Sequence, residues 1–322
     1  MNKIVVTFNV KDKQRQFIKS VIDSNADLKY LEDFAEKETI GILENADILF
    51  AWNPPKEIPG YNLKGFKKLK FVQLLSAGYD HIDFERFPSG CKIASNKGAY
   101  AEPMAEHILA MVLALSKKLF INHKKMAQGE FNQGETNISV RDSVFGILGY
   151  GGIGKAAAKL FRPFGSKIYA VNSTGKTDEE VDYIGTLNNL NFVLENSDII
   201  IISLPLVSET ENLIGKKELE LMKPDAILIN VARAQIINEE ALYKHLKTHP
   251  DFFAGIDVWW VEPFYDGEFK VNYPFFELPN VLGSPHNSPL VPGALMEGVR
   301  RAAENIKIYI KSGEPEHIVK LY

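Results

Sequence analysis

Three side chains suited to acid–base or carboxylate chemistry follow three successive apolar runs of the chain. Arg233 comes after "DAILINVA", Glu262 after "FFAGIDVWWV" and His286 after "NVLGSP". If these runs are parallel strands, their carboxyl ends share one sheet edge, where ligands bind in open α/β folds. An arginine there can hold a carboxylate, and an imidazole beside a carboxylate can move a proton. Each residue alone could also be a surface charge or a turn residue. The surrounding elements must show whether the three residues form a site.

A glycine-rich stretch, "GYGGIGKA", matches two nucleotide-binding motifs. Gly149, Gly151 and Gly154 form G-x-G-x-x-G, and Lys155 completes G-x-x-x-x-G-K. A P-loop needs a hydroxyl directly after the lysine to hold magnesium, but that position is Ala156. We find no apolar strand ending in aspartate that would anchor the metal. We therefore predict a dinucleotide site, with Lys155 facing solvent, because the glycines permit a tight turn, close approach of a pyrophosphate and close helix packing.

The next strand bears on which dinucleotide binds. About twenty residues after the fingerprint, NAD-binding proteins place an acidic side chain on the adenosine ribose. Here Asn172 stands at that position, followed by Ser173, Thr174 and Lys176. Hydroxyls and a cation suit the 2′-phosphate of NADP, so we favour NADP over NAD. The alternative is a polar turn that binds nothing.

The pattern of apolar runs predicts an α/β protein with two doubly wound parallel-sheet domains. Strands are expected at "KIVVTFN", "ADILFAW", "LKFVQLL" and "CKIAS", and a helix at "KDKQRQFIKSVID". A long apolar helix is expected over 101–119, followed by an exposed loop, "AQGEFNQGETN". A second alternation from residue 143 predicts six more strands, and a last helix should stop at Gly313.

Several motifs in this order resemble the D-isomer-specific 2-hydroxyacid dehydrogenases, particularly the glyoxylate and hydroxypyruvate reductases. They are "SAGYDHID", "GAYAEPMAEHILAMVLAL", "GILGYGGIGKAAAKLFRPFG", "SLPLVSETENLIG", "ILINVARAQIINEEAL", "AGIDVWWVEP" and "NVLGSPHNS". The resemblance implies a Rossmann domain over 101–287 inserted into a flavodoxin-like substrate (catalytic) domain over 1–100 and 288–322. It places the active site in the cleft between them and implies closure about a hinge.

The resemblance also implies a role for each strand-end residue. The reaction would move a hydride between NAD(P)H and the C2 atom of a 2-keto acid or D-2-hydroxy acid. His286 would exchange the proton, Glu262 would orient its ring and stabilise its protonated form, and Arg233 would hold the carboxylate and carbonyl. Asp257 would accept a hydrogen bond from the nicotinamide carboxamide, or would only cap its strand.

Further contacts are carried over by the resemblance alone. The substrate carboxylate is expected to meet Ser76, Ala77 and Gly78. Additional cofactor contacts are expected at Met104, Gly152, Ile153, Leu204, Pro205, Thr210, Val231 and Ala232. The chain departs from the family pattern with Ala234 after the arginine, where glycine is usual, and with Ser284 in place of threonine. Candidate pocket walls are Trp52, Tyr100 and Trp259, although Trp259 and its neighbour Trp260 also fit a core or interface pair.

Composition limits the partners and the location. The 322 residues carry a net charge of −4 with no long basic run, so neither nucleic acid nor a membrane surface is expected as a partner. The single cysteine, Cys91, fits inert packing in a reducing compartment. We see no signal peptide, membrane span, HExxH motif or Cys/His cluster, so a cytoplasmic, metal-independent protein is expected. A homodimer is expected from the resemblance.

Other functions within the same family fit parts of this pattern. The family resemblance includes transcriptional corepressors that sense dinucleotide and keep the same Arg-Glu-His set, so a binding protein with little turnover is the alternative. Formate dehydrogenase relatives carry glutamine where this chain has Glu262, so that activity is disfavoured. Phosphoglycerate dehydrogenases with a C-terminal regulatory domain would need a longer chain. The sequence does not distinguish among glyoxylate, hydroxypyruvate, pyruvate and larger keto acids as the substrate.

Overall fold

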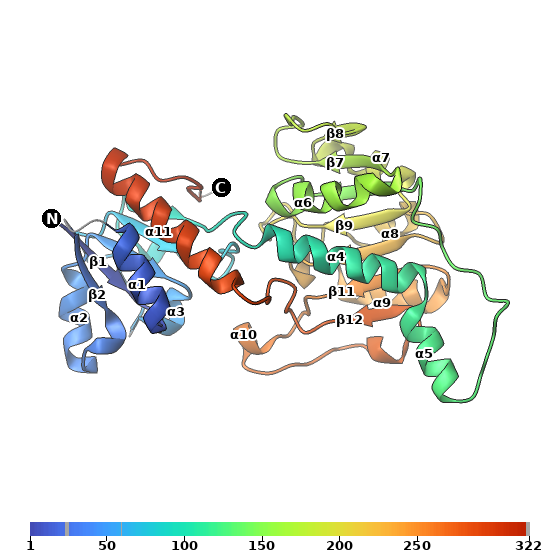
Figure 1. The fold of residues 1–322 in the computed structure, drawn as a ribbon, viewed down its shortest axis with the longest axis horizontal. Coiled ribbons are helices and arrows are strands. Elements are labelled where there is room, and N and C mark those ends of the chain that lie inside the picture. The colour runs from blue at the N-terminus through green and yellow to red at the C-terminus, as the bar shows by residue number, and fades with distance from the viewer. Residues whose placement is uncertain (23–25, 59, 320–322) are drawn as a thin grey trace. The chain divides into compact units, whose positions relative to one another are not determined.

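The protein is described by a computed structural model that covers residues 1–22, 26–58 and 60–319 (Figure 1). Asp23, the last residue of the predicted N-terminal helix, and residues 320–322 of the predicted segment 288–322 lie outside the described residues. The chain divides into two compact units, Met1–Tyr100 with Val291–Tyr322, and Ala101–Leu290. Each unit is built on one wholly parallel sheet, which confirms the predicted fold class.

The first unit, called the discontinuous unit here, has a five-stranded sheet in the order β2-β1-β3-β4-β5. This is the strand order of flavodoxin-like folds. The strands are β1 Asn2–Val6, β2 Ala26–Tyr30, β3 Ile48–Ala51, β4 Phe71–Leu74 and β5 Lys92–Ala94. The helices are α1 Asp12–Val21, α2 Glu36–Glu44, α3 Pro54–Glu57 and α11 Ala294–Ser312. Helix α11 packs on α1 and β4, and it ends at Gly313 (φ 73°), as predicted.

The second unit, called the nucleotide unit here, has a seven-stranded sheet in the order β12-β11-β10-β9-β6-β7-β8. Counted from β6, this is the Rossmann order 3-2-1-4-5-6 with one strand added. The strands are β6 Val144–Leu148, β7 Lys167–Val171, β8 Tyr183–Gly185, β9 Ile199–Ile202, β10 Ile227–Asn230, β11 Phe253–Ile256 and β12 Val281–Gly283. The helices are α4 Ala101–Ser116, α5 Leu119–Ala127, α6 Gly152–Phe161, α7 Leu190–Asn196, α8 Lys216–Leu221, α9 Glu239–Thr248 and α10 Pro263–Asp266.

Two expectations about these elements were wrong. The predicted six strands omitted β8, a three-residue edge strand whose sequence, "YIG", has no extended apolar run. The predicted helix over 101–119 is broken, because α4 ends at Ser116 and Lys118 takes a left-handed conformation (φ 48°) before α5 begins. The stretch after α5 is largely exposed, as predicted.

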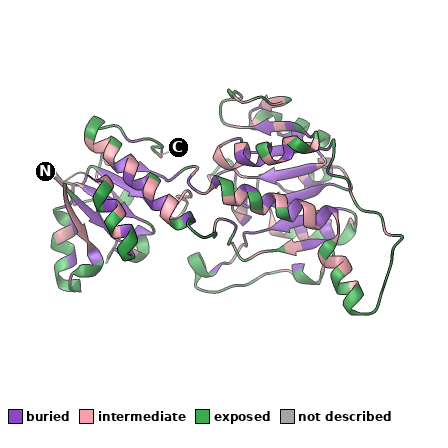
Figure 2. Cartoon of the chain, in the orientation of Figure 1, coloured by how far each residue is buried: buried purple, intermediate pink, exposed green. Residues whose placement is uncertain are grey.

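The central strands of the nucleotide unit are buried on both faces, as Figure 2 shows by their purple colour. The run Ile199–Ile202 is entirely apolar because helices cover both sides of a parallel sheet. Helices α4 and α6 pack together over one face, whereas α7, α8 and α9 contribute buried leucines and Val193 to the core on the other. None of the helices in the described part of the chain has both the length and the apolar character required to cross a membrane.

Candidate active site

The three strand-end residues lie on neighbouring strands of the nucleotide unit. Arg233 follows β10, Glu262 follows β11 and His286 follows β12, and these strands are adjacent and parallel. All three residues therefore stand at the carboxyl edge of one sheet. The same edge carries the fingerprint glycines, which follow β6.

His286 and Glu262 form the hydrogen bond that the sequence predicted. Nδ1 of His286 lies 2.6 Å from Oε2 of Glu262, whose residue is only 6% exposed. The other oxygen, Oε1, accepts a hydrogen bond from the backbone N–H of Trp259 at 2.6 Å. The N–H of Glu262 itself donates to Oδ2 of Asp266 at 2.8 Å. The carboxylate is thus fixed from two sides, and Nε2 is the imidazole nitrogen left for proton transfer.

Arg233 contacts the backbone of the preceding residue and an aromatic ring. Its Nη1 donates to the carbonyl of Ala232 at 2.7 Å, and its Cζ lies 5.9 Å from the ring centroid of Tyr265. The N–H of Tyr265 donates to the carbonyl of Glu262 at 3.1 Å, so the ring links Arg233 to the Glu262 segment. The buried amide of Asn230 bridges the backbone here, donating to the carbonyl of Arg233 at 2.9 Å and accepting from Ala232 N–H at 3.0 Å.

Asp257 is fully buried and already engaged by the loop that carries His286. Its Oδ1 accepts the hydroxyl of Ser284 at 2.5 Å and the N–H of Asn287 at 3.2 Å, and its Oδ2 accepts the N–H of Ser288 at 3.2 Å. Of the two predicted roles, these contacts favour the strand cap. The contact with the nicotinamide carboxamide stays a prediction.

Two of the fingerprint glycines stand where the backbone packs too closely for a side chain. Gly149 has φ +105°, and a Cβ there would lie 2.7 Å from the carbonyl carbon of Ser203. A Cβ on Gly154 would lie 2.5 Å from the carbonyl oxygen of Gly149. Helix α6 begins at Gly152 with Gly151 as its N-cap, so its first N–H groups lie at the glycine turn without partners inside the helix. These residues fit a dinucleotide pyrophosphate.

The turn after β7 is organised by Asn172. Its Oδ1 accepts the N–H groups of Thr174 at 3.0 Å and Gly175 at 2.7 Å, and its Nδ2 donates to the carbonyl of Lys176 at 2.8 Å. Ser173, Thr174 and Lys176 are exposed around this turn. Asn172 therefore shapes the turn, while its neighbours present the hydroxyls and the cation expected for a 2′-phosphate.

Lys155 lies at the surface, in agreement with the prediction that it faces solvent. Its Nζ also forms ion pairs there, with Asp178 at 2.9 Å and with Glu179 at 3.8 Å. This ion pair raises the pKa of Lys155, because the hydrogen bond to Asp178 favours the protonated amine. Lys155 thus ties the first turn of α6 to the segment after the Asn172 turn.

The remaining predicted contacts differ in exposure. Leu204, Thr210, Val231 and Ala232 are buried, Met104, Gly152 and Ile153 are half-buried, and Pro205 is exposed. Thr210 shapes its loop, since its hydroxyl donates to the carbonyl of Pro205 at 2.7 Å. In the discontinuous unit, Ser76, Ala77 and Gly78 follow β4, and the Ser76 hydroxyl donates to the carbonyl of Gly78 at 2.8 Å. Their contact with a substrate stays a prediction.

The tryptophans of the nucleotide unit belong to its core, in agreement with one of the two predicted alternatives. Trp259 is 4% exposed, and its Nε1 donates to the carbonyl of Ser284 at 2.9 Å. Trp260 stacks on Phe275 with ring centroids 5.5 Å apart. In the discontinuous unit, Trp52 is exposed, while the Tyr100 hydroxyl donates to the carbonyl of Leu75 at 3.1 Å.

Burial raises the pKa of the Cys91 thiol to about 12, so the thiol stays protonated near neutrality.

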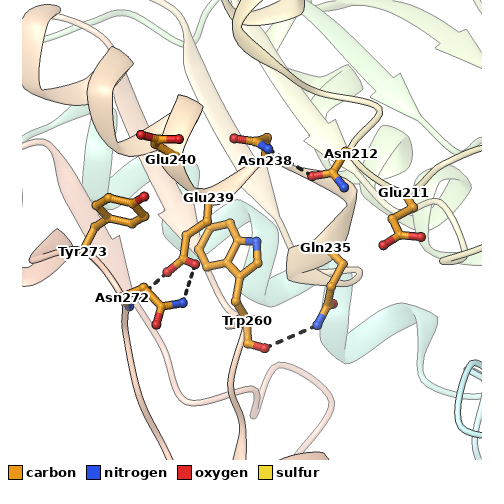
Figure 3. Close-up of a pocket in the computed structure, with 9 residues that line it drawn as sticks. All are labelled: Glu211, Asn212, Gln235, Asn238, Glu239, Glu240, Trp260, Asn272 and Tyr273. Carbon is orange, nitrogen blue, oxygen red and sulfur yellow. Dashed lines mark hydrogen bonds between the residues drawn. The ribbon is translucent and has the colours of Figure 1, made fainter.

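A cavity of about 390 Å³ in the nucleotide unit does not include the three key side chains. It is lined by Glu211, Asn212, Gln235, Asn238, Glu239, Glu240, Trp260, Asn272 and Tyr273. Figure 3 shows Glu239 directed at Asn272, which donates to both of its oxygens. Glu240 pairs with Lys244 at 2.6 Å. Two of the three cavity carboxylates therefore already hold protein partners.

Sequence reasoning missed three residues that shape the site: Asn230, Tyr265 and His107. Asn230 ends an apolar strand within the quoted motif "ILINVARAQIINEEAL" but was assigned no role. Tyr265 follows the Glu-Pro pair in a stretch that gave no periodic signal. His107 lies on α4 within a helix interpreted as apolar, although its spacing of three and four from Met104 and Met111 indicates a shared face. It reaches the Ser284 hydroxyl, with Nε2 3.0 Å from Oγ.

Comparison with known proteins gives consistent results. Residues 109–288 match the family model described as D-isomer specific 2-hydroxyacid dehydrogenase, NAD binding domain. The chain is 31% identical to a glyoxylate reductase of Thermococcus litoralis over 80% of this chain and 78% of that protein. It is 27% identical to a hydroxypyruvate reductase of Thermotoga maritima, over 86% of this chain and 90% of that protein.

A solved structure shares the whole architecture. The glycerate dehydrogenase related protein of Thermoplasma acidophilum superposes with a TM-score of 0.64 at 29% identity, covering 96% of this chain and 99% of that one. Family model, sequence relatives and fold agree over most of the chain. The chain therefore belongs to the D-isomer-specific 2-hydroxyacid dehydrogenase family, and its named reductase relatives support an enzyme.

Proposed function

We propose that this protein reduces 2-keto acids to D-2-hydroxy acids with NAD(P)H, and that Arg233, Glu262 and His286 carry the reaction. The observation that carries the proposal is the 2.6 Å hydrogen bond between His286 Nδ1 and the buried carboxylate of Glu262. The bond joins an acid–base pair at the sheet edge that also carries the fingerprint. The glyoxylate and hydroxypyruvate reductases among the relatives support the substrate class.

Each side chain has one task in this mechanism. Arg233 holds the substrate carboxylate and the carbonyl oxygen through its planar fork of donors. His286 enters as imidazolium and gives its Nε2 proton to the carbonyl oxygen as that oxygen gains negative charge. Glu262 accepts a hydrogen bond from the N–H at Nδ1 of His286. This hydrogen bond fixes the orientation of the ring and stabilises the imidazolium. When bound, the reduced nicotinamide supplies a hydride to C2 of the keto acid.

We propose Gly149, Gly151, Gly152, Ile153 and Gly154 as the pyrophosphate cradle, and NADP as the preferred dinucleotide. The N-terminus of α6 supplies N–H groups toward the phosphates. The exposed Ser173, Thr174 and Lys176 support recognition of a 2′-phosphate, because the turn holds no carboxylate that would repel it.

The first experiment follows oxidation of NADPH and NADH optically, with glyoxylate, hydroxypyruvate, pyruvate and phenylpyruvate. We expect turnover with at least one keto acid, a preference for NADPH, and a loss of about 10²–10⁴-fold in kcat for His286→Gln. Tight cofactor binding without turnover would favour the dinucleotide-sensing alternative. Full activity of His286→Gln at neutral pH would refute the proton-transfer assignment.

We also propose that the protein forms a homodimer. Helix α5 and the loop after it expose Leu119, Met126 and Phe131, the last at 73%. Large exposed apolar side chains that gather in one segment mark interaction surfaces. Light scattering after size-exclusion chromatography tests this: we expect twice the chain mass for the wild type and a shift toward one chain mass for Phe131→Asp. A cytoplasmic location remains a prediction.

A further inference from the structure

A second histidine lies beneath the loop that carries His286. His107 projects from α4, and its Nε2 is 3.0 Å from the Ser284 hydroxyl oxygen and 3.7 Å from Oδ1 of Asp257. The Ser284 hydroxyl lies 2.5 Å from the same Oδ1. The three side chains form a chain of contacts from α4, across the end of β12, to the end of β11. None of them belongs to the Arg-Glu-His set of the proposed function.

The hydrogen atoms of this cluster can be assigned by counting donors. The carboxylate of Asp257 only accepts, so the single hydroxyl proton of Ser284 points to Asp257. The Ser284 oxygen must then accept from His107, which requires a proton on Nε2 of that imidazole. Each group thus has one role: His107 donates to Ser284, and Ser284 donates to Asp257. Because the acceptor at the end is charged, both bonds are strengthened.

Asp257 transmits this arrangement to His286. Its carboxylate accepts the N–H groups of Asn287 and Ser288, and its backbone carbonyl accepts the N–H of His286 at 2.8 Å. His286 has φ +51°, in the left-handed region that non-glycine residues seldom adopt. Such a conformation persists only where its surroundings hold it. Asp257 makes three of the contacts that hold this loop.

We infer that His107 is a positioning residue for His286, acting through Ser284 and Asp257. It donates from Nε2 to Ser284, keeps the Ser284 hydroxyl on Asp257, and so keeps Asp257 oriented toward the loop that holds His286 in its left-handed conformation. The inference rests on the proposed function, since it concerns the presentation of the same imidazole. In this inference α4 supplies a positioning side chain, His107, in addition to its packing contacts.

The test compares His107→Phe, which removes the donor, with His107→Gln, whose amide nitrogen can replace Nε2. We expect His107→Phe to lower kcat about tenfold or more and to change its pH profile, while the KM for the keto acid and the Kd for NADPH change less than twofold. His107→Gln should recover most of the lost kcat. In a double-mutant cycle, Ser284→Ala should add little to His107→Phe, because both break one chain.

A second readout does not depend on turnover. Nitrogen NMR of histidine-labelled protein should show a proton on Nε2 of His107, and His107→Phe should shift the His286 ring signals. Exposed His123 is the control, since His123→Phe should move neither kcat nor the His286 signals. If the wild type reduces no keto acid but the NMR couplings appear, the proposed function fails and the positioning role stands. Unchanged kcat and unchanged His286 signals in His107→Phe would overturn the inference.

Discussion

Glu262 shows how one carboxylate can serve the site twice. Its Oε2 faces Nδ1 of His286, and its Oε1 receives the N–H of Trp259. The second bond fixes the rotation of the carboxylate, so the first bond meets the imidazole in one orientation. Since the residue is 6% exposed, water does not compete strongly for either oxygen. The negative charge of Glu262 is therefore directed at the ring that must become positive.

Glu262→Gln tests this charge while keeping the shape. The amide oxygen can still accept from Trp259, but the amide nitrogen would face Nδ1 and favour the wrong tautomer of His286. We expect kcat for keto-acid reduction to fall about 10- to 100-fold, with the Kd for NADPH unchanged within twofold. Steady-state kinetics and a fluorescence titration of NADPH measure the two quantities. Activity within twofold of the wild type would mean that the charge of Glu262 has no part in proton transfer.

Much of the candidate site could be predicted from the sequence because its residues follow strands. Arg233, Glu262 and His286 each end an apolar run, and parallel strands bring such ends to one edge. His107 could not be found this way, since it meets Ser284 across 177 residues through the packing of a helix. The ion pair of Lys155 could not be predicted for the same reason, because its partner, Asp178, lies in an irregular segment that carries no periodicity.

At the scale of elements, the turn between β6 and α6 depends on the absence of side chains. Gly149 both takes a positive φ and passes within van der Waals distance of the backbone after β9. This approach joins the fingerprint to the loop that begins at Ser203, whose hydroxyl donates to the carbonyl of Gly149 at 2.8 Å. The two loops flank the point where the strand order reverses, which is where dinucleotides bind.

Gly149→Ala should therefore reduce stability by far more than the strain of a positive φ alone would. Its Cβ would lie 2.7 Å from two backbone atoms of Ser203, neither of which can rotate away. We expect loss of measurable NADPH binding and destabilisation by more than about 2 kcal/mol. Gly129→Ala is the matched control, because Gly129 has φ +84° but nothing within 4 Å of an added Cβ. Calorimetry and NADPH titration should separate the two; equal effects would show that strain, and not the close approach, governs Gly149.

The turn after β7 allows a test of the proposed preference for NADPH. Because Asn172 already organises the backbone, Ser173 can change without collapse of the turn. Ser173→Asp would set a negative charge where the 2′-phosphate is proposed to bind. We expect the KM for NADPH to rise at least about tenfold, while the KM for NADH, which lacks that phosphate, changes less than threefold. Equal effects on the two cofactors, measured with one keto acid, would count against a phosphate site at this turn.

Two features of the nucleotide unit, the strand β8 and the break between α4 and α5, have no local signal in the sequence. β8 is held mainly by pairing with β7 at the sheet edge, with the register Tyr169↔Tyr183 to Val171↔Gly185. Such a strand needs no long apolar run of its own. The break between α4 and α5 lies at Lys118, a residue with good helix propensity, so nothing local signals it. Central strands and long helices, by contrast, carry their burial pattern in the sequence.

At the scale of the whole molecule, the two units have separate cores, and acid should affect them differently. His245 lies on α9 of the nucleotide unit, stacked on His249 with ring centroids 4.0 Å apart and meeting Phe252 edge-on. Its Nε2 is buried without a hydrogen-bond partner among the described residues. Burial lowers the pKa of His245 to about 4, with His249 adding to the shift and Glu220 opposing it.

The sign of the effect follows from proton uptake. The folded state keeps His245 neutral, whereas the unfolded chain protonates it near pH 6.5. Its contribution to stability is therefore complete above about pH 6.5 and is lost as the pH falls toward about 4. At pH 5 the loss is at most about 2 kcal/mol, because solvent around the half-buried ring screens part of the effect. The nucleotide unit should thus weaken in mild acid through this one side chain.

His245→Phe removes the titration and keeps a ring against His249. Denaturant unfolding at pH 7.5 and pH 5.0, followed by tryptophan fluorescence, measures the effect; two of the three tryptophans, Trp259 and Trp260, report on the nucleotide unit. We expect the wild type to lose more stability than His245→Phe between these pH values, by up to about 2 kcal/mol. His123→Gln, a change at an exposed histidine, should behave as the wild type. If His245→Phe loses as much stability as the wild type, proton uptake by His245 does not drive acid unfolding of this unit.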